Sequence, residues 1–176
     1  MRVLVVCLLA VLGCSVAEGA IVPKCELKQK LTDKFRVQAK KEGVEFDDTV
    51  VAKIVCHVEY ASGFNTSAVN ELTVAKEHNN RRKREDSGVF GLAKYEDTET
   101  VWTLYGLFQL SNHLICNDGT TETHNICDMD CDKLIDDNIE DDLDCVLTLF
   151  KIFVIKLIFQ DDCIYVIPSE YFKECV

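Results

Sequence analysis

The hydrophobic positions in the first third of the chain predict two α-helices. Residues 24–35 are expected to form a short one. Asp47 or Asp48 can serve as the N-cap of a second, better defined helix, and Gly63 is suited to end it as a left-handed cap. Apolar residues recur at helical spacing between these signals, namely at Val51, Ile54, Val55 and Val58.

The rest of the pattern predicts a small sheet and a buried helix. Residues 105–115 are apolar and rich in strand formers, and residues 117–119 read Asn-Asp-Gly, a strong turn signal. Residues 146–159 are almost wholly apolar but too few to cross a bilayer, so a buried central helix is expected. Residues 73–100 are polar and are interpreted as a loop or insertion. Helices at both ends around a small sheet indicate an α+β domain.

The N-terminal segment has the pattern of a secretory signal peptide. A basic residue precedes an apolar core at residues 3–12, and small residues follow at Ala17 and Gly19. Cleavage is expected between Gly19 and Ala20, with cleavage after Ala17 as the alternative. The mature domain would then comprise residues 20–176, a length that suits one domain.

Charge and cysteine content favour a secreted protein. The net charge is −11, and removal of one Arg and one Glu with the signal leaves it unchanged. Such an acidic chain repels nucleic acid and anionic membranes and attracts cations. An even number of cysteines in a secreted chain predicts four disulfides, although spacing alone does not choose the pairs. The mature cysteines are Cys25, Cys56, Cys116, Cys127, Cys131, Cys145, Cys163 and Cys175.

Several short segments together resemble the lysozyme C and α-lactalbumin family. Residues 25–27 read Cys-Glu-Leu, residues 62–66 read Ser-Gly-Phe-Asn-Thr, and residues 105–110 read Tyr-Gly-Leu-Phe-Gln-Leu, which is similar to the family's central strand. The most specific match is to the family signature, which is satisfied at each fixed position by Cys127-x3-Cys131-x2-Leu134-x3-Asn138-Ile139-x5-Cys145. The resemblance implies a lysozyme-like fold, with a helical lobe beside a small antiparallel β lobe. It also implies the disulfides Cys25–Cys175, Cys56–Cys163, Cys116–Cys131 and Cys127–Cys145.

The residues that active relatives use for catalysis are replaced here. By the resemblance, the catalytic acid position holds Ala61 and the second carboxylate position holds Leu104. Glu59 lies two residues before the acid position, and at about 100° per residue it faces away from the cleft. Active relatives carry two adjacent tryptophans that stack on sugar rings, and by the resemblance their positions hold Leu114 and Ile115 here. Since glycoside hydrolysis requires two carboxyl groups across the scissile bond, we expect no catalytic residues in this chain.

An acidic segment resembles the calcium loop of α-lactalbumin. Calcium prefers six to eight oxygen ligands, several of them carboxylates. By this resemblance, side-chain oxygens would come from Asp136, Asp141 and Asp142, and backbone carbonyls from Lys133 and Asn138. The alternative is a solvated acidic face in which two of these residues only favour a helix N-terminus.

Other features carry weaker hypotheses. Asn65 begins a glycosylation sequon. Residues 81–84, Arg-Arg-Lys-Arg, match the pattern cleaved by secretory convertases, although a solvated basic loop is the simpler interpretation. His57 and His113 are interpreted as ordinary surface or packing residues, and Trp102 lies outside the family pattern. No zinc site is expected, because the cysteines are assigned to disulfides.

Taken together, these patterns predict a secreted, monomeric, calcium-binding lysozyme-fold protein with a binding or modulatory role and no catalysis. The expected partner is an extracellular protein or glycan, with no nucleic acid and no membrane span. One alternative is an active C-type lysozyme that hydrolyses peptidoglycan. A second is an α-lactalbumin-like regulator of a galactosyltransferase. This role is disfavoured, because the family's Phe-His pair is replaced by Glu59 and Tyr60 and its Trp before the last cysteine is replaced by Lys173.

Overall fold

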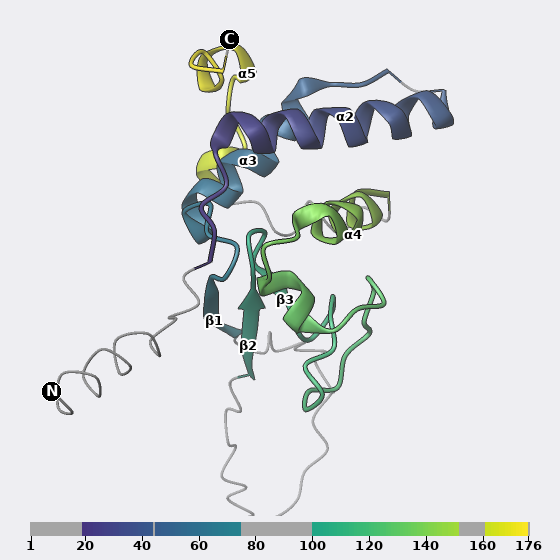
Figure 1. Cartoon of the computed structure of the whole chain (residues 1–176), viewed down its shortest axis with the longest axis vertical. Helices are drawn as coiled ribbons and strands as arrows, with labels where there is room; N and C mark the ends of the chain where they lie inside the picture. The colour runs from purple at the N-terminus through teal and green to yellow at the C-terminus, as the bar shows by residue number, and fades with distance from the viewer. Residues whose placement is uncertain (1–18, 44, 75–99, 152–160, 176) are drawn as a thin grey trace, which may run out of the picture.

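A computed structural model describes residues 19–43, 45–74, 100–151 and 161–175 (Figure 1). The helices are α2 (Lys24–Glu42), α3 (Asp48–Ser62), α4 (Ile139–Lys151) and α5 (Pro168–Tyr171), with short 3-10 helices η1 (Cys131–Ile135) and η3 (Asp161–Cys163). The strands are β1 (Val69–Val74), β2 (Thr100–Tyr105) and β3 (Leu110–Ser111). The helices gather at one end of the molecule and the sheet at the other, as Figure 1 shows. The predicted α+β class is confirmed.

Helix α2 buries one face and is longer than the sequence pattern predicted. Leu27, Leu31 and Phe35 are buried, and they recur every four residues along one side of the helix. The sequence pattern placed the end at residue 35, because the apolar periodicity stops there. The polar residues that follow continue the helix as far as Gly43, which adopts a left-handed conformation with φ 67°.

Helix α3 begins and ends where its capping residues predicted. The side chain of Asp47 accepts a hydrogen bond from the backbone N–H of Thr49 at 2.8 Å. Gly63 follows the last turn with φ 59° and caps it in the left-handed conformation. The helix contributes more of the core than its neighbours, through Val51, Ala52, Ile54, Val55, Cys56, His57 and Val58.

Replacing Asp47 with Ala is expected to lower the stability of the protein by about 1 kcal/mol, because one N–H at the start of α3 loses its acceptor. The melting temperature Tm, followed by circular dichroism, should fall by about 2–4 °C. Asp48→Ala removes an equal charge without removing this hydrogen bond and serves as the control. Equal losses in the two variants would contradict a capping role for Asp47.

The sheet is antiparallel, with strand order β1-β2-β3. Strands β1 and β2 pair along their whole length, from Val69 opposite Tyr105 to Val74 opposite Thr100. The polar insertion was therefore placed too broadly, since both of its predicted end residues, 73 and 100, lie in paired strands. Residues 75–99, including the basic run at 81–84, lie outside the described residues.

Residues 105–115, which are rich in strand formers, contain less strand than that composition indicated. Strand β2 ends at Tyr105, the chain turns through Gly106 and Gln109 at φ 71° and 52°, and β3 comprises two residues. The turn is buried: Leu107 and Phe108 are 0% and 3% exposed. Apolar residues fill this segment because the turn enters the core, and the sequence pattern mistook that burial for a strand.

Helix α4 starts earlier than predicted. The apolar run suggested a start at residue 146, but the helix begins at Ile139, inside the acidic segment. Ile139, Leu143 and Val146 are buried at helical spacing between acidic residues, so the segment is amphipathic. Residues 152–160 lie outside the described residues. Within the part of the chain that is described, no helix is long and apolar enough to cross a membrane.

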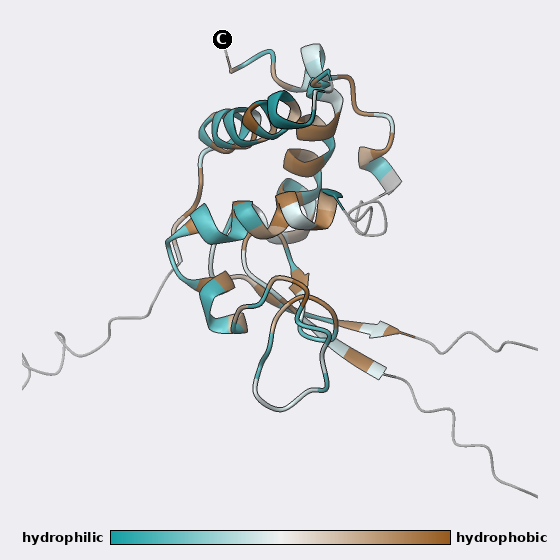
Figure 2. Cartoon of the chain, turned by 90° about the vertical axis from the view of Figure 1, so that its right-hand side faces the viewer, coloured by the Kyte–Doolittle hydropathy of each residue, from teal (hydrophilic) through white to brown (hydrophobic). Residues whose placement is uncertain are grey.

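Four disulfides join the parts of the fold. The structure contains the same pairs that the resemblance implies: Cys25–Cys175, Cys56–Cys163, Cys116–Cys131 and Cys127–Cys145. The core lies among α2, α3, α4 and the buried turn before β3. Figure 2 shows hydrophobic residues in the middle of the helical part and hydrophilic residues on its outer turns.

Candidate functional site

The two positions expected to carry catalytic carboxylates lie close together in the structure but hold apolar side chains. Ala61 is in the last turn of α3, and Leu104 is in β2 opposite Asn70 of β1. The side-chain amide of Asn70 donates to the carbonyl oxygen of Ala61 at 3.3 Å and to the side-chain oxygen of Gln109 at 2.8 Å. A neutral amide therefore connects the helix and the sheet at the place where the family's enzymes place acids.

Glu59 is committed elsewhere, as the helical spacing predicted. Its carboxylate accepts a hydrogen bond from the hydroxyl of Tyr171 at 2.5 Å and pairs with Lys24 Nζ at 3.3 Å. Burial and this carboxylate together raise the pKa of Tyr171, so the hydroxyl remains a donor. These contacts hold the end of α3 against α5 and the start of α2. Glu59 therefore serves the packing of the helices.

An aromatic pair lies on the sheet two residues along β2 from Leu104. Trp102 of β2 stacks on His113, with ring centroids 5.3 Å apart and planes inclined by 26°. Trp102 and Leu104 share a face of the sheet because they are two residues apart on one strand. At the family's tryptophan positions, Leu114 is half-buried and Ile115 is 2% exposed. Sequence reasoning missed the Trp102–His113 pair, because the two residues are brought together only by the register of the sheet.

His57 is a core residue. It is buried, and its Nε2 lies 3.3 Å from the carbonyl oxygen of Phe108, while its Nδ1 has no hydrogen-bond partner among the described residues. Burial lowers the pKa of His57, which favours the neutral form. The packing role that the sequence suggested for it is therefore confirmed.

The first turn of α4 buries a carboxylate without a partner. Asp142 is 1% exposed, and neither of its carboxylate oxygens has a hydrogen-bond partner in the described part of the chain. The Oδ1 atom of Asp141 is also buried and has no hydrogen-bond partner among the described residues. Burial, followed by the charges of Asp141 and Asp136, raises the pKa of Asp142 to about 8. A buried carboxylate with no donor is costly unless a cation or proton neutralises it.

The predicted calcium ligands occupy η1, the start of α4 and the turn between them. Asp136 ends η1, where its Oδ1 accepts from the N–H of Asn138 at 2.8 Å, and Lys133 lies exposed within η1. The described residues contain no group of three or more His, Cys, Asp or Glu side chains already gathered for a metal. The donor chemistry fits calcium through the unpartnered oxygens of Asp141 and Asp142, and Asp136 is near enough for its charge to act on them.

Asp137, which the sequence analysis did not single out, is the most contacted acid of this turn. Its Oδ1 accepts from the backbone N–H of Ala20 and from the hydroxyl of Thr66, both at 3.0 Å. Thr66 is fully buried. Nothing in the local sequence distinguishes Asp137 from its acidic neighbours, since both donors come from distant segments.

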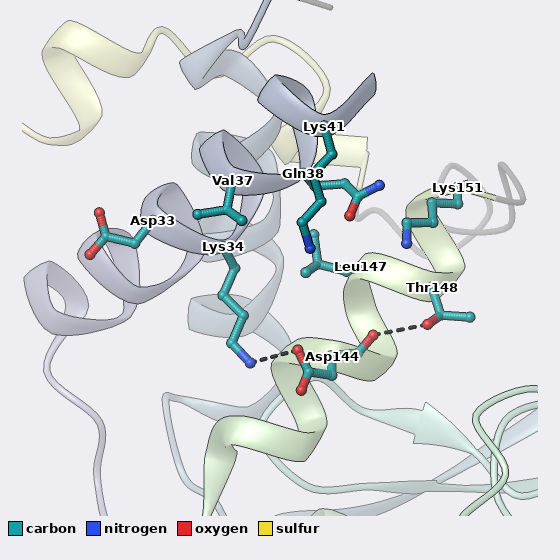
Figure 3. A pocket seen from close by; sticks show the side chains of 9 residues that line it. All are labelled: Asp33, Lys34, Val37, Gln38, Lys41, Asp144, Leu147, Thr148 and Lys151. Atoms are coloured by element: carbon teal, nitrogen blue, oxygen red, sulfur yellow. Dashed lines mark hydrogen bonds and ion pairs between the residues drawn. The ribbon is translucent and has the colours of Figure 1, made fainter. Parts of the chain in front are cut away.

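Ion pairs from α2 hold the start of α4. Lys34 Nζ lies 2.6 Å from Asp144 and 3.3 Å from Glu140, and Lys30 Nζ lies 2.7 Å from Glu140. Figure 3 shows Lys34 pointing to Asp144 beside a surface pocket of about 470 Å³ between the two helices. These pairs are exposed, so each adds little stability. They orient α4, and with it Asp142, relative to α2.

The sequon residue Asn65 is half-buried beside the N-terminal segment. Its side-chain oxygen accepts from the N–H and the hydroxyl of Ser67 at 3.0 and 3.1 Å. Its backbone forms an isolated bridge with Ile21. Glycosylation at this residue stays a prediction.

The arrangement defines a class of protein: an α+β domain whose four disulfides join helices to a small antiparallel sheet, with an acidic turn leading into a core helix. A model of the C-type lysozyme/alpha-lactalbumin family matches residues 92–163. Lysozyme C of Equus asinus is 34% identical over 125 residues, covering 71% of this chain and 72% of that protein. The chain belongs to the C-type lysozyme/alpha-lactalbumin family.

Other relatives and solved structures are consistent with this placement. Sperm acrosome-associated protein 5 of Mus musculus is 32% identical over 142 residues, 81% of this chain and 68% of that protein. Alpha-lactalbumin of Homo sapiens is 32% identical over 130 residues, 73% of this chain and 66% of that protein. The crystal structure of holo-type canine milk lysozyme aligns with a TM-score of 0.54 and 26% identity, over 90% of this chain and 99% of that one.

Proposed function

We propose that this chain is a secreted lysozyme-fold protein that binds calcium, does not hydrolyse glycosidic bonds and acts by binding an extracellular protein or glycan. The observation that carries the loss of hydrolysis is the pair of apolar residues, Ala61 in α3 and Leu104 in β2, at the positions where the resemblance places the catalytic carboxyl groups. The amide of Asn70 bridges helix and sheet there, and an amide supplies neither a proton at neutral pH nor a negative charge.

The chemistry explains why this replacement matters. Glycoside hydrolysis needs one protonated carboxyl group to release the leaving sugar and one carboxylate to stabilise or attack the cationic sugar carbon. Alanine and leucine can do neither. Glu59 is the nearest acid along α3, and its contacts with Lys24 and Tyr171 direct it towards α5.

One face of the β1–β2 pair supports a binding role. Leu72 lies opposite Trp102 across the β1–β2 pair, and Leu72 is 46% exposed. Together with Leu104 and the Trp102–His113 stack, these side chains form an apolar and aromatic surface. Such surfaces supply contact area to a partner, with aromatic side chains contributing more than most.

Calcium binding is supported by the unpartnered oxygens of Asp141 and Asp142 at the start of α4. A bound calcium ion would supply positive charge to these oxygens and to Asp136. Backbone carbonyls of Lys133 and Asn138 would complete the oxygen set that calcium prefers. The disulfides Cys116–Cys131 and Cys127–Cys145 restrain both ends of this turn, so the ligands lose little freedom on binding.

Secretion is supported by four disulfides in the folded domain, because such bonds persist in oxidising compartments. The signal-peptide pattern of residues 1–19 agrees with this compartment.

The purified mature protein is expected to release no sugar from bacterial peptidoglycan, as measured by cell-wall turbidity and reducing-end assays. The double variant Ala61→Glu/Leu104→Asp, which places a carboxyl group at both of these positions, is measured beside it for comparison. Activity in the double variant alone would support the assignment of these two positions. Activity in the unchanged protein that survives further purification would contradict the proposed function.

A further inference from the structure

The segment that begins at Ala20 is fixed in place by hydrogen bonds to the chain after α3. The carbonyl oxygen of Ala20 accepts from the N–H of Thr66 at 3.0 Å, and Val22 donates its N–H to the carbonyl oxygen of Phe64 at 3.0 Å. Between these contacts, Ile21 forms a bridge with Asn65. The backbone nitrogen of Ala20 therefore has a defined position.

That nitrogen lies 3.0 Å from the Oδ1 atom of Asp137. Thr66 donates its hydroxyl to the same oxygen at 3.0 Å, and Thr66 is fully buried. A carboxylate held by a buried hydroxyl and aimed at one nitrogen is suited to a cation at that nitrogen, because charge-assisted hydrogen bonds are about twice as strong as neutral ones. An uncleaved chain presents only a peptide N–H there.

We propose that Asp137 is the binding site for the α-ammonium group of the mature chain, so that removal of residues 1–19 completes the folded structure. The proposal rests on secretion with cleavage between Gly19 and Ala20. A signal endopeptidase uses water to break that amide: the hydroxyl adds to the carbonyl carbon of Gly19, and the nitrogen of Ala20 takes a hydrogen. The free amine takes up a further proton at neutral pH, because its ordinary pKa is about 7.7–8.0.

The two cleavage positions that the sequence left open would present different groups to Asp137. Cleavage after Ala17 would leave two residues ahead of Ala20, so its nitrogen would remain a peptide N–H. Gly19 is itself hydrogen-bonded, because its backbone N–H donates to the Ser67 hydroxyl at 3.0 Å, and the nitrogen that faces Asp137 is that of the next residue, Ala20. Only a chain that begins at Ala20 puts its positive charge against Asp137.

The pairing also affects the calcium turn. Asp137 stands between Asp136 and Asn138, and an ammonium ion on its carboxylate would neutralise one of the charges crowded there. It would also commit that carboxylate to the ammonium group, so Asp137 would stay outside the proposed ligand set. Cleavage of the signal peptide would thereby lower the negative charge of the turn without adding a metal ligand to it.

The first test is the pKa of the α-amino group in the secreted protein, after N-terminal sequencing has shown the first residue. NMR titration is expected to give a pKa at least half a unit above about 8, and Asp137→Asn should return it to the ordinary range. Asp132→Asn removes a nearby exposed charge that makes no contact with Ala20, and it should leave the pKa raised. A secreted chain that begins elsewhere, or a pKa that Asp137→Asn does not change, would overturn the proposal.

The second test compares stabilities. A chain that retains Gly19 should have a Tm about 2–4 °C lower than the chain that begins at Ala20. In the Asp137→Asn background the same extension should have no effect. Because pairing raises the folded-state pKa of the amine, the difference should be present at pH 7 and disappear as the pH rises through that pKa. An equal effect of the extension in both backgrounds would refute the pairing while leaving secretion intact.

Discussion

Replacing Asp142 with Asn is expected to raise the Tm of the calcium-free protein and to abolish the further rise that calcium produces in the unchanged protein. Asp142 is 1% exposed, and its two oxygens have no hydrogen-bond partner among the described residues. An uncharged amide of the same size removes the cost of burying this carboxylate beside Asp141 and Asp136, and it removes one of the proposed calcium ligands. Each 1 kcal/mol regained should add about 2–4 °C to the Tm.

The same substitution should change the pH dependence of stability in the presence of a chelator. The folded state raises the pKa of Asp142 from 3.8 to about 8, so between these values the folded chain binds more protons than the unfolded chain. Stability of the calcium-free protein should therefore fall as the pH rises through this interval. The difference in Tm between Asp142→Asn and the unchanged protein should grow from pH 5 to pH 8.

The Tm measured with and without calcium tests the role of Asp142 in binding the ion. A ligand that binds only the folded state stabilises it by about 2.7 kcal/mol at a hundredfold excess over its Kd. Asp132→Asn removes an exposed acid of η1 that is not among the proposed ligands, and it should keep the calcium response. A calcium-dependent rise in Tm that persists in Asp142→Asn would show that the ion binds elsewhere.

Replacing Gly106 with Ala is expected to lower the free energy of unfolding by at least about 3 kcal/mol. Gly106 has φ 71°, and a Cβ atom there would overlap the carbonyl oxygen of Leu134 in η1. The left-handed backbone and the collision with a backbone atom act together, which places this change among the most destabilising single substitutions. Because η1 carries part of the calcium turn, the calcium response should weaken as well.

Gly119 offers a control that separates the two causes. It has φ 78°, but a Cβ atom there meets nothing within 4 Å. Gly119→Ala should therefore cost only the backbone strain, about 1 kcal/mol. Urea unfolding of both variants measures the difference, and similar losses would mean that the contact with Leu134 is unimportant.

Local signals in the sequence were sufficient for α3. Its N-cap Asp47, its apolar spacing and its terminal Gly63 all act within the helix or one residue beyond it, so no distant contact was needed to find them. The family motifs likewise led to the four disulfide pairs that the structure contains. The sequence was least informative where an apolar run could signal either a strand or burial.

The buried turn at residues 106–109 illustrates that limit. Leu107 and Phe108 are apolar because the turn enters the core, and hydropathy does not distinguish this from a strand. Helix α4 was misplaced for a related reason, because its first turn consists mainly of acids whose amphipathic role emerges only when Ile139 and Leu143 are seen to be buried.

The candidate site depended still more on distant contacts. Ala61 and Leu104 could be recognised from motifs, since each lies at a fixed distance from a cysteine or a Tyr-Gly pair. The Trp102–His113 stack and the contact of Asp137 with Ala20 join residues that no local pattern relates. Such pairs become visible only when the chain has folded.

The pairing of Val74 with Thr100 has an evolutionary consequence. The two ends of the intervening sequence are already joined by the β1–β2 ladder, so the cost of extra residues there is set mainly by loop-closure entropy when they add no structure of their own. Each doubling of a loop's length costs about 0.6 kcal/mol, a small fraction of the stability of a domain. Descendants of a common ancestor could therefore gain or lose residues between Val74 and Thr100 while the β1–β2 ladder and the acidic turn kept their geometry.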